Sequence, residues 1–402
     1  MTIKTGTARA RIVWKIQIGS IQSRNTMIVQ GGHLFLGTCG KRWNQRDKDD
    51  GVYCIDVKSG EVVWFTPTLS DVNEIVVVGR QIIAPTDSGD VFVIDSANGE
   101  IAEIYRADSP VFGEPLTFQA VGAWKAFFAS HLGTFYYVES GSSILHTLGE
   151  RGGGFRAGLM PIGSDGFVAV AENGDVLKGS LQTGKLLTHP IALAPDGEFA
   201  GGTSISSRPL VIGDKAYIGF ARCTYDRNPA VFCVDLREES VVWAASNSDE
   251  KESFGNCRTT PVMVANKLVV ASAYTDRLAF LSPDTGELIG GVKLGLNVFQ
   301  QWSSPVQISP HHVAIGRVDG VCSIVDVVNE ELVSSISLAT PETERLGRVN
   351  LGKEYQEHNY GLYPGEPAPV GGICGTPSVS GSSLFVGTTA GTLARIDFSL
   401  AH

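Results

Sequence analysis

Apolar and polar residues alternate along most of this chain in short runs, which is the two-residue period of a β-strand with one buried face. One phrase recurs: an alternating run, a turn that opens with Asp or Ser and usually contains Gly, and a second alternating run. It reads GVYCIDVKSGEVVW from Gly51 and DVFVIDSANGEI from Asp90. Further copies begin at Phe135, Val176, Val231, Leu278, Cys322 and Leu393. Eight hairpins of this kind indicate a repeat protein.

Another β-branched run precedes each hairpin and ends in a small residue or glycine, as in HLFLGTCG, KAFFASHLG and SLFVGTTAG. The small residues near these strand ends include Ala129, Ser272, Gly316 and Gly387. Small side chains suit the crowded inner part of a wedge-shaped blade. We therefore predict an all-β fold, an eight-bladed β-propeller of four-stranded antiparallel blades. Seven blades are the alternative, because the third, fourth and seventh copies depart from the pattern.

The repeat predicts the roles of individual residues in its turns and in its last strands. The residues expected to accept backbone hydrogen bonds in the turns are Asp56, Asp95, Ser180, Asp235 and Asp326. The glycines expected to take positive φ are Gly60, Gly99, Gly184 and Gly286. Where Glu239 or Glu331 replaces this glycine, we expect a different turn. Trp64 and Trp243, near the ends of last strands, are expected to be buried between adjacent blades.

The eighth hairpin, LARIDFSLAH, stops where its second strand should begin. Residues Arg11 to Gln17 (RIVWKIQ) have the pattern of the missing strand, and they put Trp14 in the place of Trp64. We predict that this N-terminal strand closes the ring, because closure removes an exposed sheet edge. Residues 1–402 are accordingly taken as a single propeller domain with a long inserted loop at 341–372.

The repeat, written x-[VL]-[YF]-x-[VI]-D-x-x-[TS]-G-[EK]-x-[VL]-W, resembles that of propellers built from pyrroloquinoline-quinone-type (PQQ-like) repeats. That superfamily includes quinoprotein dehydrogenases and outer-membrane-assembly lipoproteins. The resemblance extends from Arg9 to His402. It implies the propeller fold but not one function, because this repeat occurs in both enzymes and scaffolds.

Composition and charge exclude several classes of partner. The chain has 32 Lys and Arg against 42 Asp and Glu, a net charge of -10, which disfavours binding to the phosphate backbone of a nucleic acid. Lys15 and Gln17 interrupt the apolar residues at the N-terminus, so we expect neither a signal peptide nor a membrane span. The seven cysteines form no CxxC motif and no adjacent pair. This pattern favours a reducing, cytoplasmic location.

Motifs for cofactors and metals receive little support. Quinoprotein dehydrogenases usually hold their quinone against an adjacent-cysteine disulfide, with a tryptophan and calcium, and the sequence lacks this combination. The string Asp47-Lys-Asp49-Asp50-Gly51 lacks the rest of an EF-hand loop and is interpreted as a solvated loop. The glycine-rich stretch Gly149–Ala157 follows a hairpin and should lead into blade four rather than bind a dinucleotide. We expect no catalytic residue, cofactor or metal.

Three insertions interrupt the repeat. Thr38–Asp50 and Ala221–Pro229 lengthen connections between second and third strands, and Pro341–Gly372 lengthens a connection between blades. In an antiparallel blade both classes of connection lie on one face, so these insertions should decorate that face with Arg, Tyr and Trp, residues common in binding hot spots. The candidate binding residues are Arg42, Trp43, Arg222, Tyr225, Tyr355, His358 and Tyr360. The starts of the inner strands should line the upper channel with Arg156, Cys257, Arg258, Gln301, Trp302 and Cys374.

Two functions stay open at this point. The first is a non-catalytic cytoplasmic scaffold or binding module that holds another protein, or an oligomeric partner, on the decorated face. The alternative is an enzyme or small-molecule binder with its pocket in the central funnel, where His358 or Tyr360 would act as acid or base and Arg258 or Arg42 would hold an anionic substrate. Loops that only cover the funnel mouth with solvated charges are a third interpretation of the insertions.

Overall fold

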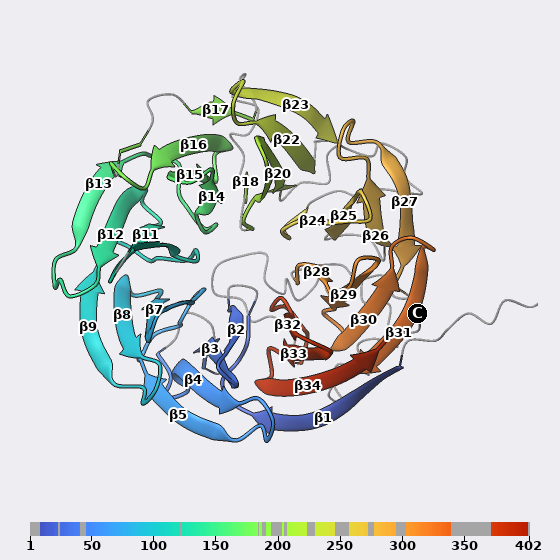
Figure 1. Ribbon diagram of the computed structural model, residues 1–402, viewed down its shortest axis with the longest axis horizontal. Helices are drawn as coiled ribbons and strands as arrows, with labels where there is room; N and C mark the ends of the chain where they lie inside the picture. The colour runs from blue at the N-terminus through green and yellow to red at the C-terminus, as the bar shows by residue number, and fades with distance from the viewer. Residues whose placement is uncertain are drawn as a thin grey trace, which may run out of the picture.

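The computed structural model describes residues 9–22, 25–40, 46–120, 122–183, 185–186, 190–193, 203–204, 207–222, 230–245, 257–271, 277–294, 303–338 and 371–400. Within these residues the chain forms eight four-stranded antiparallel sheets, which stand as blades around a central axis (Figure 1). The prediction of an eight-bladed propeller is confirmed, and the seven-bladed alternative is wrong. The described part of the chain contains no helix of the length and apolarity needed to cross a membrane.

The strands of the first four blades follow the chain from the inner to the outer edge. Blade 1 has β2 (Met27–Gln30), β3 (His33–Cys39), β4 (Asp50–Asp56) and β5 (Val62–Pro67). Blade 2 has β6 (Val76–Val78), β7 (Gln81–Pro85), β8 (Asp90–Asp95) and β9 (Ile101–Arg106). Blade 3 has β10 (Leu116–Ala120), β11 (Ala123–Ala129), β12 (Thr134–Glu139) and β13 (His146–Glu150). Blade 4 has β14 (Met160–Ile162), β15 (Gly166–Val170), β16 (Asp175–Ser180) and β17 (Ile191–Ala192).

The other four blades keep this order. Blade 5 has β19 (Leu210–Ile212), β20 (Lys215–Gly219), β22 (Val231–Asp235) and β23 (Ser240–Ala245), beside a short pair of β18 (Thr203–Ser204) and β21 (Ala221–Arg222). Blade 6 has β24 (Val262–Val264), β25 (Lys267–Ala271), β26 (Arg277–Leu281) and β27 (Leu288–Lys293). Blade 7 has β28 (Val306–Gln307), β29 (His312–Gly316), β30 (Val321–Asp326) and β31 (Glu331–Ser337). Blade 8 has β32 (Ser378–Ser380), β33 (Ser383–Gly387), β34 (Thr392–Ser399) and β1 (Arg9–Gln17).

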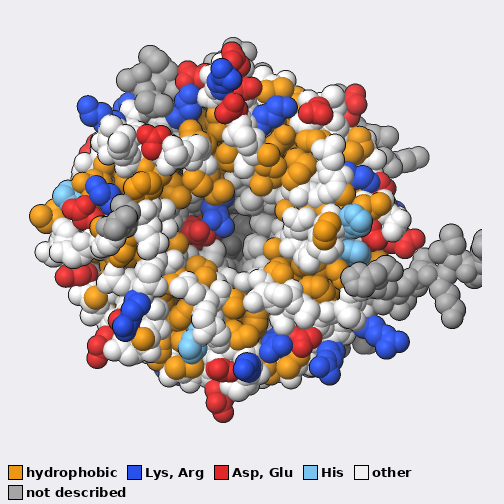
Figure 2. Space-filling model, in the orientation of Figure 1, with side chains coloured by type: hydrophobic (Ala, Val, Ile, Leu, Met, Phe, Trp, Pro, Cys, Tyr) orange, Lys and Arg blue, Asp and Glu red, His pale blue; other side chains and the backbone are white. Residues whose placement is uncertain are grey.

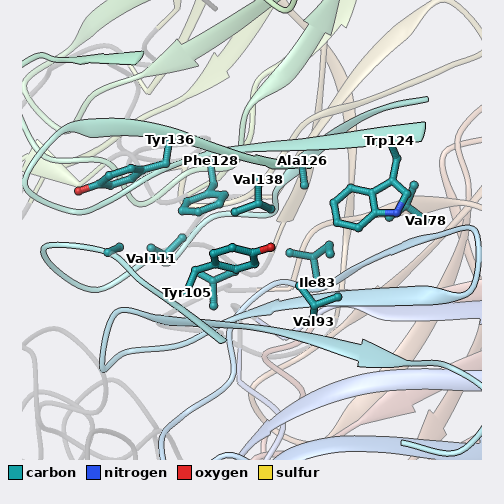
Figure 3. Close-up of a cluster of buried hydrophobic side chains, with 12 residues drawn as sticks. Val78, Ile83, Val93, Tyr105, Val111, Trp124, Ala126, Phe128, Tyr136 and Val138 are labelled. Atoms are coloured by element: carbon teal, nitrogen blue, oxygen red, sulfur yellow. The ribbon is translucent and has the colours of Figure 1, made fainter. Parts of the chain in front are cut away.

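The apolar core lies between blades, in layers that are each shared by two neighbours. The middle strands are buried on both faces, as in β8, where Val91 to Ile94 are all buried, because a blade packs on either side of them. Figure 3 shows the layer between blades 2 and 3, where Ile83 and Val93 face Ala126 and Phe128. Equivalent clusters fill the other interfaces that the described residues form.

The N-terminal strand closes the ring as predicted. Strand β1 pairs antiparallel with β34, from Arg9 opposite Ser399 to Gln17 opposite Thr392. In Figure 1 it lies outside β34 as the outer strand of blade 8. The indole Nε1 of Trp14 donates to the backbone oxygen of Val57 in the next blade at 3.1 Å. Two chain ends therefore share one sheet.

Tryptophans of the outer strands join each blade to the turn of the next. Trp64 donates its Nε1 hydrogen to the backbone oxygen of Ser96 at 3.3 Å, and Trp243 donates to that of Pro283 at 3.1 Å. The ring of Trp64 also covers Gly99, where a Cβ would lie 2.8 Å from it. Trp14 over Gly60 and Trp243 over Gly286 have the same arrangement. These rings pack between adjacent blades as predicted, and each is half-buried there.

The turn residues also behave as predicted, with one correction. The turn acceptors, each taking one or more backbone N–H groups, are Asp56, Asp95, Ser180, Asp235 and Asp326. The glycines with positive φ are Gly60 (77°), Gly99 (77°) and Gly286 (73°), whereas Gly184 lies outside the described residues. Glu239 keeps the left-handed φ at 54°, so the expectation of a different turn was wrong. In blade 7 the equivalent residue is Glu330 (58°), and Glu331 instead begins β31.

Lysines explain why glutamate is tolerated in these two turns. Lys267 Nζ donates to the backbone oxygen of Val327 at 3.1 Å and to Glu330 Oε1 at 2.8 Å. Lys178 makes the same pair of contacts with Leu236 and Glu239. In each case the ammonium group donates to the same backbone carbonyl of the turn that a tryptophan N–H binds in other blades. The left-handed conformation of the glutamate costs about 1–2 kcal/mol, and the ion pair offsets part of this cost.

Small residues end the second strands because the next blade packs against them. A Cβ on Gly316 would overlap Ile373, and one on Gly387 would overlap Ile21. Both isoleucines lie in the segments that lead into the next inner strand. Ala129 is buried in the same way, and Ser272 lies outside the described residues.

Candidate functional site

Two classes of connection meet on one face of the disc, which we call the upper face. These are the connections between second and third strands and those from an outer strand to the next inner strand. Backbone hydrogen bonds join them, such as Cys39 N to Ser20 O at 2.9 Å and His131 N to Pro110 O at 2.7 Å. The three insertions connect β3 to β4, β20 to β22 and β31 to β32, so they are of the predicted classes.

Most of the predicted binding residues lie outside the described residues. They are Arg42, Trp43, Tyr225, Trp302, Tyr355, His358 and Tyr360, and the loop over 341–370 lies there too. Arg222 is in β21, where its backbone pairs with Thr203. Arg258 is only 7% exposed and lines the central cavity at the start of blade 6. Of the predicted residues that the structure describes, Arg258 is the one at this cavity.

Three other residues expected along the channel lie elsewhere. Arg156 pairs its Nε with Glu172, and its guanidinium lies 4.9 Å from the ring centre of Phe112, on the upper face between blades. Cys257 and Cys374 are buried in the layers between blades, where burial raises the pKa of the Cys374 thiol to about 12. All three side chains therefore contact neighbouring blades and do not line the cavity. Gln301 lies outside the described residues.

A cavity of about 630 Å³ occupies the centre of the ring. Figure 2 shows the hollow, with acidic and basic side chains inside it. Much of its polar lining comes from one position of the repeat, one or two residues before the inner strand: Thr26, Glu74, Glu114, Arg208, Thr260, Ser304 and Thr376. This position has no constant residue type, so the repeat phrase of the sequence does not mark it. A proline follows five of these residues, for example in Glu114-Pro115 and Arg208-Pro209, and aligning the copies on that proline would have revealed the position.

Side chains at this inner position bind the backbone of a neighbouring blade. The Ile75 N–H donates to Thr26 Oγ1 at 2.9 Å, and the Thr260 N–H donates to Ser304 Oγ at 2.9 Å. The Glu114 N–H donates to Glu74 Oε2 at 2.7 Å. These bonds satisfy backbone groups at the inner edge, which would otherwise be left unpaired at the narrowest part of the ring.

A charged cluster stands in the cavity. Arg208 Nη1 of blade 5 pairs with Glu114 Oε2 of blade 3 at 2.8 Å, so this contact passes blade 4. Gly158 of blade 4 makes space for the contact between Arg208 and Glu114. A Cβ at this position would lie 2.9 Å from Arg208 Cδ and 2.8 Å from the Glu114 nitrogen. Burial raises the pKa of Glu114 to about 7, with Arg208 lowering it and Glu74 raising it. Burial lowers the pKa of Arg208, but Glu74 and Glu114 outweigh this effect and raise it.

Carboxylates gather on the upper face over blades 1 to 3. This acidic sector consists of Asp47, Asp49, Asp50, Asp71, Asp87, Asp90 and Asp108. Burial raises the pKa of Asp50 to about 6; the Asp47 N–H opposes this, and the charges of Asp47, Asp49 and Asp87 add to it. The expectation of a solvated loop over Asp47–Gly51 was therefore wrong for Asp50, which is fully buried against its own turn. Within the described ranges, no group of three or more His, Cys, Asp or Glu side chains could hold a metal ion.

Two leucines project from the acidic sector. Leu69 is 57% exposed and Leu132 is 67% exposed, and both lie in connections of the upper face. Leu69 has φ of 57°, the left-handed region that a bulky side chain rarely adopts. The intervening loops are linked, since Ser88 N donates to Ser70 Oγ at 3.1 Å and Leu132 N to Ser109 Oγ at 3.0 Å. Neither leucine was predicted from the sequence, because an isolated apolar residue in a loop carries no periodic signal.

Comparison with known proteins finds both a sequence family and similar structures. The family model described as "Outer membrane protein assembly factor BamB" matches residues 2–116. The crystal structure of BamB from Moraxella catarrhalis has a TM-score of 0.67 and 12% identity, and the match covers 98% of this chain and 99% of that one. The computationally designed Ika8 protein has a TM-score of 0.59 and 12% identity, with 95% and 98% covered. No curated protein matches the chain.

These comparisons bear on fold more than on activity, because 12% identity is evidence for a shared fold alone. The family match adds sequence similarity over β1, blades 1 and 2 and the lead into blade 3. The similar structures cover nearly the whole chain. The resemblance to propellers built from PQQ-like repeats, which the hairpin phrase predicted, is thereby confirmed.

Proposed function

We propose that this chain is a protein-interaction module that binds a partner protein on the upper face over blades 1 to 3. The observation that carries the proposal is Leu69, an exposed leucine held in the left-handed region. Such a conformation disfavours an L-residue by about 1–2 kcal/mol, and strain of this kind gathers at functional sites. The exposed side chain gains little from the fold in return. Binding of a partner supplies the missing contact.

The surroundings of Leu69 indicate the chemistry of that partner. Leu132 offers a second apolar anchor on the same face. The acidic sector reaches both leucines, since Asp71 follows Leu69 by two residues and Ser109, which accepts the Leu132 N–H, donates to Asp108 Oδ1 at 3.2 Å. The whole chain has a net charge of -10. Apolar anchors inside a charged rim are typical of binding hot spots, and complementary charge accelerates encounter. The partner segment should therefore present apolar side chains flanked by Lys or Arg.

The family comparison supports a protein partner. The matching model describes an assembly factor for outer membrane proteins, and its match, residues 2–116, contains Leu69 and the whole acidic sector. A role in assembling other proteins agrees with a binding face in this part of the ring. The aromatic and arginine residues predicted for the insertions would enlarge the same face.

The test is a pair of variants with a matched control. The partner is captured on the immobilised wild-type chain from an extract of the source organism, purified, and measured by titration calorimetry. We expect the double variant Leu69→Asn with Leu132→Ser to weaken binding about tenfold or more, because Asn tolerates the left-handed backbone while the apolar anchors are lost. Ile144→Ser is the control, since Ile144 is 59% exposed in the β12–β13 turn on the opposite face. Wild-type affinity in the double variant would refute the proposal.

The central cavity favours a second candidate function, binding of a small molecule. A cavity of about 630 Å³ with converging polar groups, including Arg258, is the kind of site in which small ligands bind. The acid or base expected for an enzyme, His358 or Tyr360, lies outside the described residues. A screen of small metabolites by thermal shift, repeated on Arg258→Leu, tests this alternative. A ligand that stabilises the wild type and not the variant would support it, and the absence of any such ligand would count against it.

We further propose a reducing, cytoplasmic location. Cys54, Cys233, Cys257, Cys322 and Cys374 are buried as free thiols. Burial raises the pKa of the Cys54 and Cys322 thiols to about 12, which keeps them protonated and unreactive. Cell fractionation, with alkylation of the thiols after denaturation, tests the proposal. Recovery in a membrane or exported fraction, or oxidised cysteines, would refute it.

A further inference from the structure

We infer that the outer edge of β1 binds an extended acidic segment of another protein, which adds a fifth strand to blade 8. This inference goes beyond the proposed role of the upper face and does not depend on it. Strand β1 lies at the rim of the disc, whereas Leu69 and Leu132 lie in the loops of the upper face (Figure 1).

Strand β1 pairs on one edge only. Within the described ranges it stands at the end of its sheet, in the order β1-β34-β33-β32. Alternate residues of an antiparallel strand direct their N–H and C=O groups to opposite edges, so the groups on the outer edge of β1 face outward from the sheet. Ile12 is 37% exposed and Val13 is 41% exposed. The middle of the strand is therefore open to solvent, and another strand can reach it.

Length and charge distinguish β1 from the outer strands of the other seven blades. It has nine residues, whereas β31 has seven and the others have six or fewer. It carries Arg9, Arg11 and Lys15, all exposed, and no carboxylate. Figure 2 shows Lys and Arg side chains along this part of the rim, at the lower right. In the part of the chain that the structure describes, no other outer strand carries more than one Lys or Arg.

The fold pairs little of this positive charge. Asp397 stands opposite Arg11 in the sheet, but Arg395 Nε binds its carboxylate at 2.9 Å and the Ser383 hydroxyl donates to it at 2.6 Å. Arg11 acts on this carboxylate only through its charge. Among the described residues, none forms an ion pair with the three cations of β1. On a chain with a net charge of -10, this edge is thus a local site for an acidic partner.

The register of β1 indicates which side chains the partner presents. Arg9 and Arg11 are two residues apart in the regular part of the strand, before the irregularity that follows Ile12, so both project from one face of the sheet. Ala10 and Ile12 project from the other face. Side chains directly opposite each other in paired strands share a face, and opposite charges there stabilise the pairing. The partner segment should therefore alternate Asp or Glu with β-branched apolar residues.

A second copy of this chain fits the edge poorly. Two β1 strands paired antiparallel about Ala10 would place Arg9 of each copy opposite Arg11 of the other. Like charges placed opposite each other destabilise a sheet, and basic residues at an edge commonly prevent self-pairing in this way. The same residues attract a strand of opposite charge. The charge of β1 therefore selects an acidic segment of a different protein.

The first experiment compares three peptides of the same length on the wild-type protein. They are acetyl-Thr-Glu-Val-Glu-Val-Glu-Thr-amide, its counterpart with Lys for Glu, and its counterpart with Pro for Val. Binding is measured by NMR titration at low salt. We expect the acidic peptide to bind about tenfold or more tightly than the lysine peptide, because only its charges complement β1. The proline peptide keeps the acidic charge but cannot pair as a strand, so it should bind about tenfold or more weakly. Equal binding of the acidic and proline peptides would overturn the inference.

A pair of variants tests the role of the arginines. Arg9→Gln with Arg11→Gln should weaken binding of the acidic peptide about tenfold or more. The control is Arg237→Gln with Lys293→Gln, which removes the same charge from exposed residues in the turn after β22 and in the outer strand β27. The control should bind nearly as tightly as the wild type. Equal weakening in the two variants would contradict a site at β1.

Hydrogen exchange in the wild type locates the site without any variant, and so keeps the test valid if the arginine variant folds poorly. Addition of the acidic peptide should slow exchange of amides in β1 at alternate positions, because those N–H groups become bonded to the added strand. Protection elsewhere in the ring, with β1 unchanged, would refute the inference.

Two further arms separate other occupants and the two proposals. Binding of phosphatidylserine vesicles without binding of the acidic peptide would identify the edge as a basic membrane contact and overturn the inference. The double variant Leu69→Asn with Leu132→Ser should bind the acidic peptide as the wild type does. Failure of the upper-face proposal is therefore recognised independently of the edge of β1.

Discussion

At the scale of single residues, neighbouring blades are fastened by two alternative pairs of side chains. One pair is a tryptophan over a turn glycine, as with Trp64 and Gly99. The other is a lysine with a turn glutamate, as with Lys267 and Glu330. In blade 6 the outer strand has Gly290 at the tryptophan position, and a Cβ there would overlap the Glu330 carboxylate. In the first pair the outer strand supplies the large residue and the turn supplies glycine. Between blades 6 and 7 the outer strand supplies glycine and the turn supplies the large residue.

Gly99→Ala tests how tightly the first pair packs. The new Cβ would lie 2.8 Å from the Trp64 ring at a φ of 77°, so overpacking adds to backbone strain. We expect the free energy of unfolding in urea to fall by about 2–4 kcal/mol. Gly79→Ala is the control, because its φ is 60° and nothing lies near the new Cβ, and it should lose only about 1–2 kcal/mol. Equal losses in the two variants would mean that the tryptophan contact is loose.

Asp50 should make stability depend on pH in the sense opposite to that of most carboxylates. Its pKa in the folded chain is about 6 against 3.8 as the ordinary value, so the folded state binds the proton more tightly. The resulting stabilisation is full below pH 3.8 and is lost as the pH rises through about 6. Two pKa units correspond to about 3 kcal/mol as an upper bound. Asp50→Asn should therefore raise the free energy of unfolding at pH 8 by about 1–3 kcal/mol.

The measurement is urea unfolding of wild type and Asp50→Asn at pH 5 and pH 8. The gain should be smaller at pH 5 than at pH 8. Asp56 provides the contrast, because backbone N–H donation from Ser59 lowers its pKa, so Asp56→Asn should destabilise the protein at pH 8. A gain in Asp50→Asn that does not change with pH would rule out ionisation as its cause.

Sites that carry the same amino acid in several copies of the repeat could be predicted from the sequence. Sites that are equivalent in the fold but carry a different amino acid in each copy could not. Asp56 and Trp64 return in other copies, so periodicity identified both. The inner position carries Thr, Glu, Arg or Ser in different blades, and the pair of Arg208 and Glu114 depends on contact across the ring. Glu330 was missed by one residue because its turn lacks the glycine that fixes the register.

At the scale of elements, position within a blade decides how a strand is buried. Middle strands are covered by two neighbours, whereas the outer strands alternate, as β23 does with Val242 exposed and Ala245 buried. The sequence predicted the hairpins of middle and outer strands well, because both carry long alternating runs. The two-residue strands β18 and β21 carry no such run, and their pairing joins Thr203 to Arg222 through contacts that local patterning cannot indicate.

Strand β1 should contribute more to stability than its exposed sequence indicates. It supplies the edge of blade 8 and the Trp14 contact to blade 1. Deletion of residues 1–19 should expose β34 as a bare edge, and we expect a sharp fall in the melting temperature or aggregation, measured by calorimetry and light scattering. Deletion of residues 1–8, which precede β1, should change neither. An unchanged melting temperature after the longer deletion would contradict the role of β1 as the closing strand.

At the scale of the whole molecule, the described residues form eight apolar layers between blades in place of one central core. The central cavity is the space enclosed by the inner strands of the blades. Stability then depends on completing the ring, because each layer needs both of its blades. The charged cluster joins blades 3 and 5 across the axis.

A circular permutant tests the value of a blade built from both chain ends. The new chain begins at Lys251 and ends at Glu250, between blades 5 and 6. A short Gly/Ser linker joins Arg9 to Ser399, which are paired in blade 8. Each blade is then made of consecutive strands. We expect native far-ultraviolet circular dichroism but unfolding in urea about tenfold or more faster, since the new ends can separate without breaking a sheet. Unfolding at the wild-type rate would mean that the shared blade gives no kinetic protection.

The pairing of β1 with β34 also imposes an order on biosynthesis. The side chain of Gln17 binds the backbone oxygen of Ala390, a residue 373 positions later. At about 5–20 residues per second, a ribosome takes roughly 20–75 s to synthesise the intervening chain. Throughout that time the first strand made has no partner, and its exposed β-edge can pair with other nascent chains. This protein should therefore need protection by a chaperone until translation ends, and slowing its translation should increase aggregation rather than help folding.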